Sequence, residues 1–339
     1  MVEWLDIPDE TKQNAYIQIA EATGMSPFAV EKDWWVVETI SSIFESDASR
    51  SMVFKGGTSL SKAWGLINRF SEDIDLAIDR GFLGFEGELT KSKRTRLRKA
   101  ASAYTSGVFF EMLKNKFDER EIEGVEFKMV EAKDSDQDPR IIEMYYPNVI
   151  PIPGYIEARV QIEVGCRSMR EPFRIVNFGS LIDEYYSERS FSQNPISVPT
   201  VLPERTFLEK VFLLHEEFHR SVEKIRVNRL SRHIYDVVKM AQTKVVDKAL
   251  SNRELYQNIV NHRFSFSRVG GVDYNLLQPQ TIDPLPIPEL SKVWKEDYSI
   301  MVEQMIFEPS PPSYSQLIEQ LTSLKERINQ LPWQIETNF

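Results

Sequence analysis

The chain has 339 residues, of which 42% are hydrophobic and 11% aromatic, and its formal net charge is −10 at pH 7. Such a chain can bury a sizeable core as one large or two medium domains, and its charge argues against a protein that coats nucleic acid through its overall field. Its single cysteine, Cys166, excludes an internal disulfide or a cysteine-rich zinc site. Because no apolar run approaches about 18 residues and no signal-like start is visible, we expect a cytoplasmic protein without a membrane span.

Two helices are predicted at the start of the chain, over residues 9–24 and 26–45. Ser26 as N-cap and Pro27 in the first turn mark where the second helix begins. A short apolar strand over 51–54 follows. We expect both helices to pack on the sheet to which this strand belongs.

A double glycine, Gly56-Gly57, ends that strand. Thr58 is then expected to cap a helix. Residues 73–78 alternate between polar and apolar side chains, which predicts a strand with one face in the core.

The rest of the chain changes from strands to helices near residue 200. A basic helix is predicted over 91–120. The expected strands, which we predict to extend the sheet as a meander, are 125–130, 141–146, 156–164 and 173–178. The expected helices that follow are near 204–220, 226–243, 247–262, 289–307 and 313–330. The sequence thus predicts an α+β fold, with a mixed sheet and flanking helices in residues 1–200 and a mainly helical domain in 201–339.

The glycine turn and two carboxylates form the most informative constellation. Asp73 and Asp75, two residues apart on a strand, point to one side, as needed to bridge two divalent cations about 3.5–4 Å apart. Gly56 and Gly57 let backbone amides approach a phosphate, and the helix N-terminus at Thr58 adds a positive dipole end. Alone, each motif would indicate an ordinary turn or a solvated strand face. Together they predict a site for metal ions and nucleotide phosphates.

Residues 54–76, FKGGTSLSKAWGLINRFSEDIDL, resemble the signature of the AbiEii/AbiGii toxin nucleotidyltransferases, which include the mycobacterial MenT toxins. That signature is Lys-Gly-Gly-Thr followed by Arg-Phe-Ser-x-Asp-x-Asp-Leu. Residues 31–33, 203–210 and 232–236 resemble the leading helix and the helical motifs of the family. The resemblance covers residues 26–240 and is loose over the last hundred.

The resemblance implies a DNA polymerase β-like sheet, Mg²⁺ or Mn²⁺ as cofactor, and transfer of a nucleotide from a nucleoside triphosphate (NTP) to the 3′ end of tRNA. By motif position it assigns metal binding to Asp73 and Asp75, nucleotide contact to Ser71 and Lys210, and a supporting catalytic role to Asp236. The helical domain would complete the active site and present the acceptor. The protein would be the toxin of a toxin–antitoxin or phage-defence system, with an antitoxin as partner.

A third carboxylate is not marked by a strong motif, and the interval from Gly57 to Asp73 is longer than in the wider superfamily. Glu163 is the candidate, because the residues from 156 to 164 alternate and place it opposite an apolar face. It can accept the proton of an attacking hydroxyl or share a metal ion. A solvated glutamate on a strand face is the equal alternative.

Two basic clusters suit contact with RNA phosphates on one face. The first puts six cations in nine residues: Lys91, Lys93, Arg94, Arg96, Arg98 and Lys99. The second comprises Arg220, Lys224, Arg226, Arg229 and Arg232. Arg229, Arg232, His233 and Asp236 have the spacing of one helix face, which can form a salt-bridge network, an RNA-contact surface or both. Lys210 is expected at the border of a buried helix face, where it can neutralise charge on the β- and γ-phosphates, a solvated lysine being the alternative.

Residues 215–219, HEEFH, match the H-E-x-x-H pattern of zinc proteases. No later segment supplies a convincing third ligand, so a buried histidine pair is the favoured interpretation. Two further functions fit the same scaffold: a nucleotidyltransferase that acts on a small molecule or a protein, and an inactive nucleotide-binding module.

Overall fold

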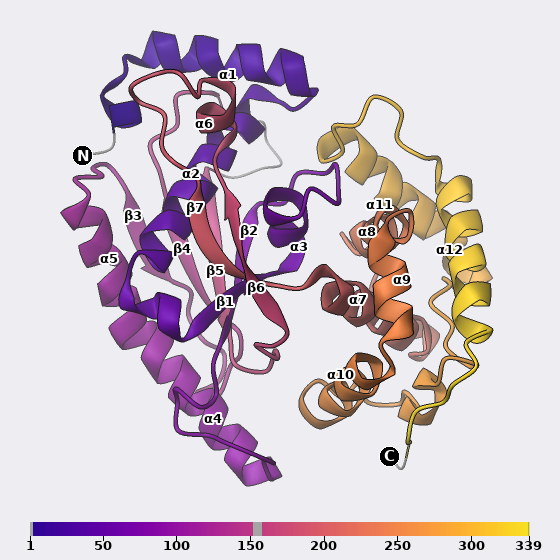
Figure 1. Cartoon of the computed structure of the whole chain (residues 1–339). Helices are drawn as coiled ribbons and strands as arrows, with labels where there is room; N and C mark the ends of the chain where they lie inside the picture. Colours follow the sequence, from indigo (N-terminus) through magenta and orange to yellow (C-terminus); the bar gives the residue numbers. More distant parts are fainter. Residues whose placement is uncertain (1–2, 152–157, 338) are drawn as a thin grey trace. The chain divides into compact units, whose positions relative to one another are not determined.

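A computed structural model describes residues 3–151, 158–337 and 339. The chain divides into two compact units, Met1–Trp64 with Phe70–Val201, and Gly65–Arg69 with Leu202–Phe339. The sheet lies in the first unit and the second is mainly helical, so the predicted α+β fold class is confirmed (Figure 1). None of the helices within the described ranges has the length and hydrophobicity of a membrane span.

A mixed sheet of seven strands, in the order β3-β4-β5-β2-β1-β7-β6, forms the centre of the first unit (Figure 1). The strands are β1 (Met52–Lys55), β2 (Asp73–Ile78), β3 (Glu126–Met129), β4 (Arg140–Tyr145), β5 (Arg159–Gly165), β6 (Phe173–Phe178) and β7 (Ile196–Val201). The pairs β2–β5 and β1–β7 are parallel, and the others are antiparallel. Apart from residues 156 and 157, which lie outside the described residues, the predicted strands are confirmed.

The predicted meander is only partly correct. β3, β4 and β5 are antiparallel neighbours, but β6 lies at the opposite edge of the sheet, where it pairs with β7. β7 was missed because Pro199 interrupts its apolar run and cannot donate a backbone hydrogen bond. Its pairing with β1 is short and centres on Phe54 and Thr200, which leaves room for that proline.

Ten helical segments of the first unit fall in the described ranges. They are η1 (Glu3–Asp6), α1 (Asp9–Thr23), α2 (Pro27–Phe44), η2 (Asp47–Arg50), α3 (Gly56–Thr58), η3 (Ser59–Ala63), α4 (Lys91–Tyr104), η4 (Thr105–Phe109), α5 (Phe110–Glu119) and α6 (Leu181–Tyr185). The predicted helix over 91–120 is confirmed as the continuous stretch α4–η4–α5, in which η4 is a π-helical turn. Ser26 caps α2 as predicted, since its side chain accepts the N–H of Ala29.

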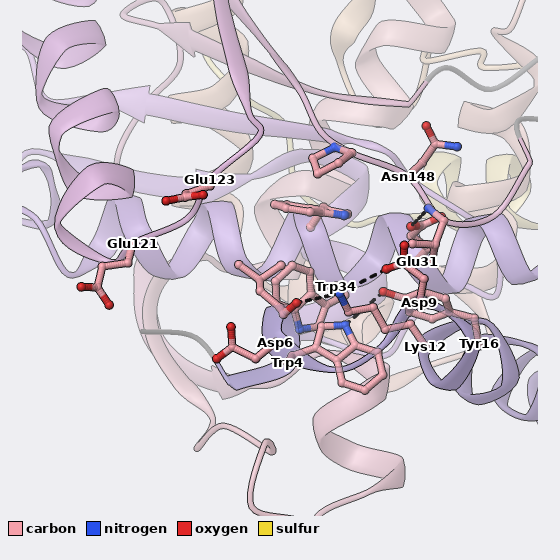
Figure 2. A pocket seen from close by; sticks show the side chains of 14 residues that line it. Trp4, Asp6, Asp9, Lys12, Tyr16, Glu31, Trp34, Glu121, Glu123 and Asn148 are labelled. Atoms are coloured by element: carbon pink, nitrogen blue, oxygen red, sulfur yellow. Dashed lines mark hydrogen bonds and ion pairs between the residues drawn. The ribbon is translucent and has the colours of Figure 1, made fainter.

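α2 is buried along almost its whole length, because it packs on the sheet and against α1, α5 and α6. Burying charged side chains is costly unless each has a partner. Three of the four charged residues of α2 therefore form ion pairs, Lys32 with Glu72 at 2.8 Å, Asp33 with Lys62 at 2.9 Å and Glu38 with Arg120 at 2.7 Å. The fourth, Glu31, accepts backbone N–H groups (Figure 2). These pairs fix α2 in one position against the sheet.

The second unit is built around α7, which contacts α8, α9 and α10. Its helices are α7 (Pro203–Phe218), η5 (Val222–Lys224), α8 (Ser231–Ala241), α9 (Lys244–Ser251), α10 (Arg253–Phe266), η6 (Tyr274–Leu277), η7 (Pro288–Leu290), α11 (Ser291–Gln304) and α12 (Tyr314–Asn329). The prediction over 226–243 was too long, because Arg229 has a φ of 59°, which a helix does not allow. The segment 247–262 is two helices, because Asn252 interrupts it and caps α10 through Leu255 N–H.

Candidate active site

Asp73 and Asp75 lie on β2, near the middle of the sheet. They alternate with Ile74 and Leu76, both fully buried, while the two aspartates are only partly buried. The apolar face of β2 therefore anchors the strand in the core. Both carboxylates project from the other face, as the alternation predicted.

The glycine turn after β1 packs directly against the Asp75 carboxylate. Gly56 has a φ of 81°, and a Cβ atom at this position would lie 1.9 Å from Asp75 Oδ2. Lys55 pairs with Asp75 across β1 and β2, and its Nζ lies 3.6 Å from Asp75 Oδ1. Lys55 was missed as a site residue, although it is the first residue of the Lys-Gly-Gly-Thr motif.

Thr58 is not a helix cap, which corrects the prediction. The helix begins earlier, at Gly56, and Gly57 lies inside its first turn. The Thr58 hydroxyl instead donates to the carbonyl oxygen of Asp73 at 2.5 Å and lies 3.0 Å from Ser71 Oγ. The glycine turn, Ser71 and the aspartate strand are thus held together within the first unit.

Glu163 lies on β5 opposite Asp75 in the parallel pair β2–β5. Its neighbours Val160, Ile162 and Val164 are buried, so Glu163 faces away from the core as predicted. Burial, together with the negative charges of Asp75 and Asp73, raises the pKa of Glu163 to about 7. The three carboxylates therefore interact electrostatically.

The donor set fits a hard divalent cation. Asp73 and Asp75 offer carboxylate oxygens from one strand face, the ligand type that Mg²⁺ and Mn²⁺ prefer, and a cation would offset the repulsion that Glu163 experiences. Within the described ranges, no three Asp, Glu, His or Cys side chains are arranged to hold one metal ion. Metal binding by Asp73 and Asp75 and a ligand role for Glu163 therefore stay predictions.

Lys210 and Asp236 lie on α7 and α8 of the second unit. Asp236 is fully buried and accepts two hydrogen bonds from Arg69, at 2.7 Å from Nε and 2.8 Å from Nη2. Lys210 Nζ lies 3.0 Å from Asp236 Oδ2 and 3.1 Å from His233 Nδ1. Lys210 is only 8% exposed, so the predicted border position is wrong.

In this buried group, opposite charges nearby act against the effect of burial on the pKa values of Asp236 and Lys210. Burial alone would raise the pKa of Asp236, but the charges of Arg69 and Lys210 hold it well below its usual range. Burial lowers the pKa of Lys210, and the charge of Asp236 opposes that shift. Each member is therefore buried at low cost only while the others are present.

Arg229 does not share a helix face with Asp236, which corrects the second basic cluster. It precedes α8, and its backbone N–H donates to Asp297 Oδ1 at 2.6 Å. Arg232 lies in the first turn of α8 and is partly exposed. Arg229 was misassigned because the helix was expected to include residue 229, whereas α8 begins at Ser231.

Residues 40–320 match the family described as "Nucleotidyl transferase AbiEii toxin, Type IV TA system". The chain belongs to this family. It is therefore a nucleotidyltransferase toxin of a type IV toxin–antitoxin system, which has an antitoxin as partner and a nucleoside triphosphate as substrate. The resemblance seen in residues 54–76 is confirmed.

Three solved structures are similar to this AbiEii-family chain. MenT4, a nucleotidyltransferase toxin from Mycobacterium tuberculosis, is 15% identical, with 95% of this chain and 99% of that chain covered and a TM-score of 0.43. JHP933 from Helicobacter pylori is 12% identical over 89% and 92%, with a TM-score of 0.43. A putative nucleotidyltransferase from H. pylori is 12% identical over 90% and 96%, with a TM-score of 0.44. No curated protein matches the chain.

The first basic cluster of this AbiEii-family chain lies on α4. Leu97 is buried and anchors the helix, whereas Lys91, Lys93, Arg96 and Lys99 are exposed. The other two cations have contacts within the protein: Arg98 pairs with Asp136 at 2.5 Å, and Arg94 donates to the Leu89 carbonyl oxygen at 3.0 Å. Four of the six cations thus face solvent.

The HEEFH segment, residues 215–219, forms the last turn and C-cap of α7, and its first four residues are buried. His215 is fully buried, stacks on His219 with ring centroids 3.8 Å apart, and accepts the N–H of Asp283 through Nδ1 at 2.9 Å. Burial, and next the neighbouring His219, lower the pKa of His215 to about 3. The ring is therefore a neutral acceptor at physiological pH.

The two glutamates of the segment are also engaged. Glu216 is ion-paired with Arg263, and Glu217 with Arg226 at 2.6 Å. A protease glutamate must reach a metal-bound water. Here both carboxylates are ion-paired, Glu216 with the partly buried Arg263 and Glu217 with the exposed Arg226, which accounts for the motif without a zinc site.

Proposed function

We propose that this chain transfers a nucleoside monophosphate from an NTP to the 3′ end of tRNA, and that the reaction requires Mg²⁺ or Mn²⁺. The observation that carries the proposal is the packing of Gly56 against the carboxylate of Asp75. It puts a backbone turn without side chains beside an aspartate pair. A triphosphate and its cation can therefore approach the same point.

In the proposed reaction, the acceptor hydroxyl oxygen forms a bond to the α-phosphorus. The bond from that phosphorus to the bridging oxygen breaks, and pyrophosphate leaves with the bonding electrons. Glu163, which lies opposite Asp75 in the pair β2–β5, suits a group that takes the hydroxyl proton. Asp73 and Asp75 would hold the cation, which neutralises triphosphate charge.

Lys210 is proposed to contact the nucleotide phosphates. An ammonium group has three N–H donors, and among the described residues two of them have partners, Asp236 and His233. The remaining donor suits a phosphate oxygen. Asp236 then acts as a positioning residue that keeps Lys210 charged and oriented.

The choice of tRNA as acceptor rests on the family resemblance and on the exposed cations of α4. Phosphate contacts from lysine and arginine supply most of the sequence-independent affinity for nucleic acid. A short basic helix on an acidic protein suits contact with RNA at one face. Arg232 is a further candidate contact in the second unit.

The test is incubation of the purified chain with each α-labelled NTP and total RNA, with Mg²⁺ or EDTA. We expect metal-dependent label in RNA of tRNA size, and a loss of roughly 100-fold or more in Asp75→Asn, as for other lost electrostatic contacts in active sites. Asp79→Asn, the same charge change just after β2, should keep activity. Label in protein or in small molecules instead of RNA would show that tRNA is not the acceptor. No transfer with either metal ion would contradict the proposal.

A further inference from the structure

Lys55 lies in the same row of the sheet as Asp75 and Glu163. Asp75 pairs with Lys55 across β1 and β2, and with Glu163 across β2 and β5. Residues that are directly paired on neighbouring strands project from the same face of a sheet. The ammonium group of Lys55 therefore belongs to the face that carries the carboxylates of the candidate active site.

The contact between Lys55 and Asp75 is ionic and loose. Lys55 Nζ lies 3.6 Å from Asp75 Oδ1, which is longer than an N–H···O hydrogen bond. The side chain of Lys55 is 22% exposed and that of Asp75 is 24% exposed, so a ligand on this face can reach both groups. The contact is therefore one that a ligand can replace.

Two other lysines of the first unit show the opposite arrangement. Lys32 Nζ lies 2.8 Å from Glu72, and Lys62 Nζ lies 2.9 Å from Asp33, with the two lysine side chains only 2% and 12% exposed. Breaking a short, buried ion pair of this kind is costly. Lys55, with its longer and more exposed contact, is better suited to exchange its partner when a ligand binds.

The proposed reaction brings two charged ligands to this face. A divalent cation at Asp75 would repel the Lys55 ammonium group, because both are positive and share one carboxylate. The triphosphate is negative, so Asp73, Asp75 and Glu163 repel it and Lys55 attracts it. Lysine carries a point charge on a flexible four-carbon stem, so it can turn from a carboxylate to a phosphate without a change in the backbone.

We propose that Lys55 is a nucleotide-binding residue, whose ammonium group balances Asp75 until the cation binds there and then contacts a phosphate oxygen of the NTP. This role rests on the proposed function, because it requires that the aspartates hold the cation and that the triphosphate binds beside them. A lysine that only held Asp75 in place would instead promote binding of the cation.

The two roles predict opposite changes when the charge is removed. Lys55→Met keeps the length of the side chain without its charge. We expect Mn²⁺ to bind this variant roughly threefold more tightly than the wild type, because one competing positive charge is lost. At saturating Mn²⁺, the α,β-methylene analogues of the NTPs should bind roughly tenfold more weakly. Calorimetry measures both affinities without turnover.

The matched control is Lys128→Met, the same charge change at a lysine of β3 whose side chain is 52% exposed. It should leave both affinities unchanged. A second readout needs no variant, because acetylation of the wild-type chain can be followed at each lysine by mass spectrometry. Mn²⁺ with an analogue should slow acetylation of Lys55 severalfold and leave that of Lys128 unchanged.

Three results would each overturn the role of Lys55: unchanged or weaker Mn²⁺ binding in Lys55→Met, unchanged affinity of that variant for the analogues, or no protection of Lys55 in the wild type. The proposed function would survive all three, since the wild type would still bind the cation and the analogues. A wild-type chain that binds neither would contradict the proposed function and the role of Lys55 together.

Discussion

The absence of a side chain at Gly56 leaves the space that the Asp75 carboxylate occupies. Gly56 also has a positive φ, which residues with a Cβ atom rarely adopt. Two requirements, one conformational and one steric, thus coincide at a single position. They are separable, because Gly84 has a φ of 80° but nothing within 4 Å of its missing Cβ.

Gly56→Ala should reduce transferase activity far more than Gly84→Ala. Both variants are destabilised by about 1–2 kcal/mol for a left-handed alanine. Only the first also displaces Asp75, and a displacement of about 1 Å at a reacting centre can cost 100-fold in rate. Activity and urea unfolding are measured together. Equal activity in the two variants would mean that the Asp75 position does not matter for transfer.

At the scale of single elements, α2 is a helix with buried charged side chains. Its glutamates and lysine are all buried, and Glu31 differs from the rest because backbone N–H groups are its hydrogen-bond partners. Burial raises the pKa of Glu31 from 4.5 to about 7. The folded chain therefore binds this proton more tightly than the unfolded chain does.

This shift makes stability depend on pH. The contribution of Glu31 is fully present below about pH 4.5 and is lost as the pH rises through about 7. The free energy of unfolding of the wild type should thus fall relative to Glu31→Gln over this window, by on the order of 3 kcal/mol. Urea unfolding between pH 5 and pH 8, with Glu10→Gln as control, measures the difference. Parallel pH profiles for wild type and Glu31→Gln would contradict the shift.

The helix α4 is the element that should contact RNA. Replacing three exposed lysines with glutamine should weaken binding of tRNA and reduce the salt dependence, by roughly 0.7–0.9 in the slope of log K against log salt for each phosphate that the helix no longer neutralises. The variant changes Lys91, Lys93 and Lys99. Its control, with the same loss of charge elsewhere in the first unit, changes Lys114, Lys128 and Lys133. Equal salt slopes in the two triple variants would remove α4 from the interface.

At the scale of the whole molecule, membership of the AbiEii family implies that the activity harms the host. Induction of the wild-type chain without its antitoxin should arrest growth. Asp75→Asn should not, because it lacks one of the two carboxylates proposed to hold the cation. Growth curves of the two cultures test this prediction, and soluble protein is confirmed in both. If the Asp75→Asn culture arrests as well, toxicity does not come from nucleotide transfer.

The sequence by itself determined the features that depend on neighbours within a few residues. The alternation in β2, the Ser26 cap of α2 and the glycine turn after β1 are such features, because strand periodicity and backbone freedom are local. The same local signals, with the family signature, were enough to identify the class of enzyme. Thr58 and Arg229 were misassigned because the predicted helix starts were wrong: one helix begins at Gly56, before Thr58, and the other at Ser231, after Arg229.

Only the tertiary structure decided which distant segments meet. The register of β5 beside β2, which puts Glu163 opposite Asp75, and the pairing of Arg69 with Asp236, 167 residues away, are set by packing over long stretches of chain. The same holds for HEEFH, whose glutamates find arginines that no spacing rule reveals. Such pairings form because an unpaired buried charge is costly, so the fold places an opposite charge beside it. The number of residues between two side chains does not tell whether they meet in space.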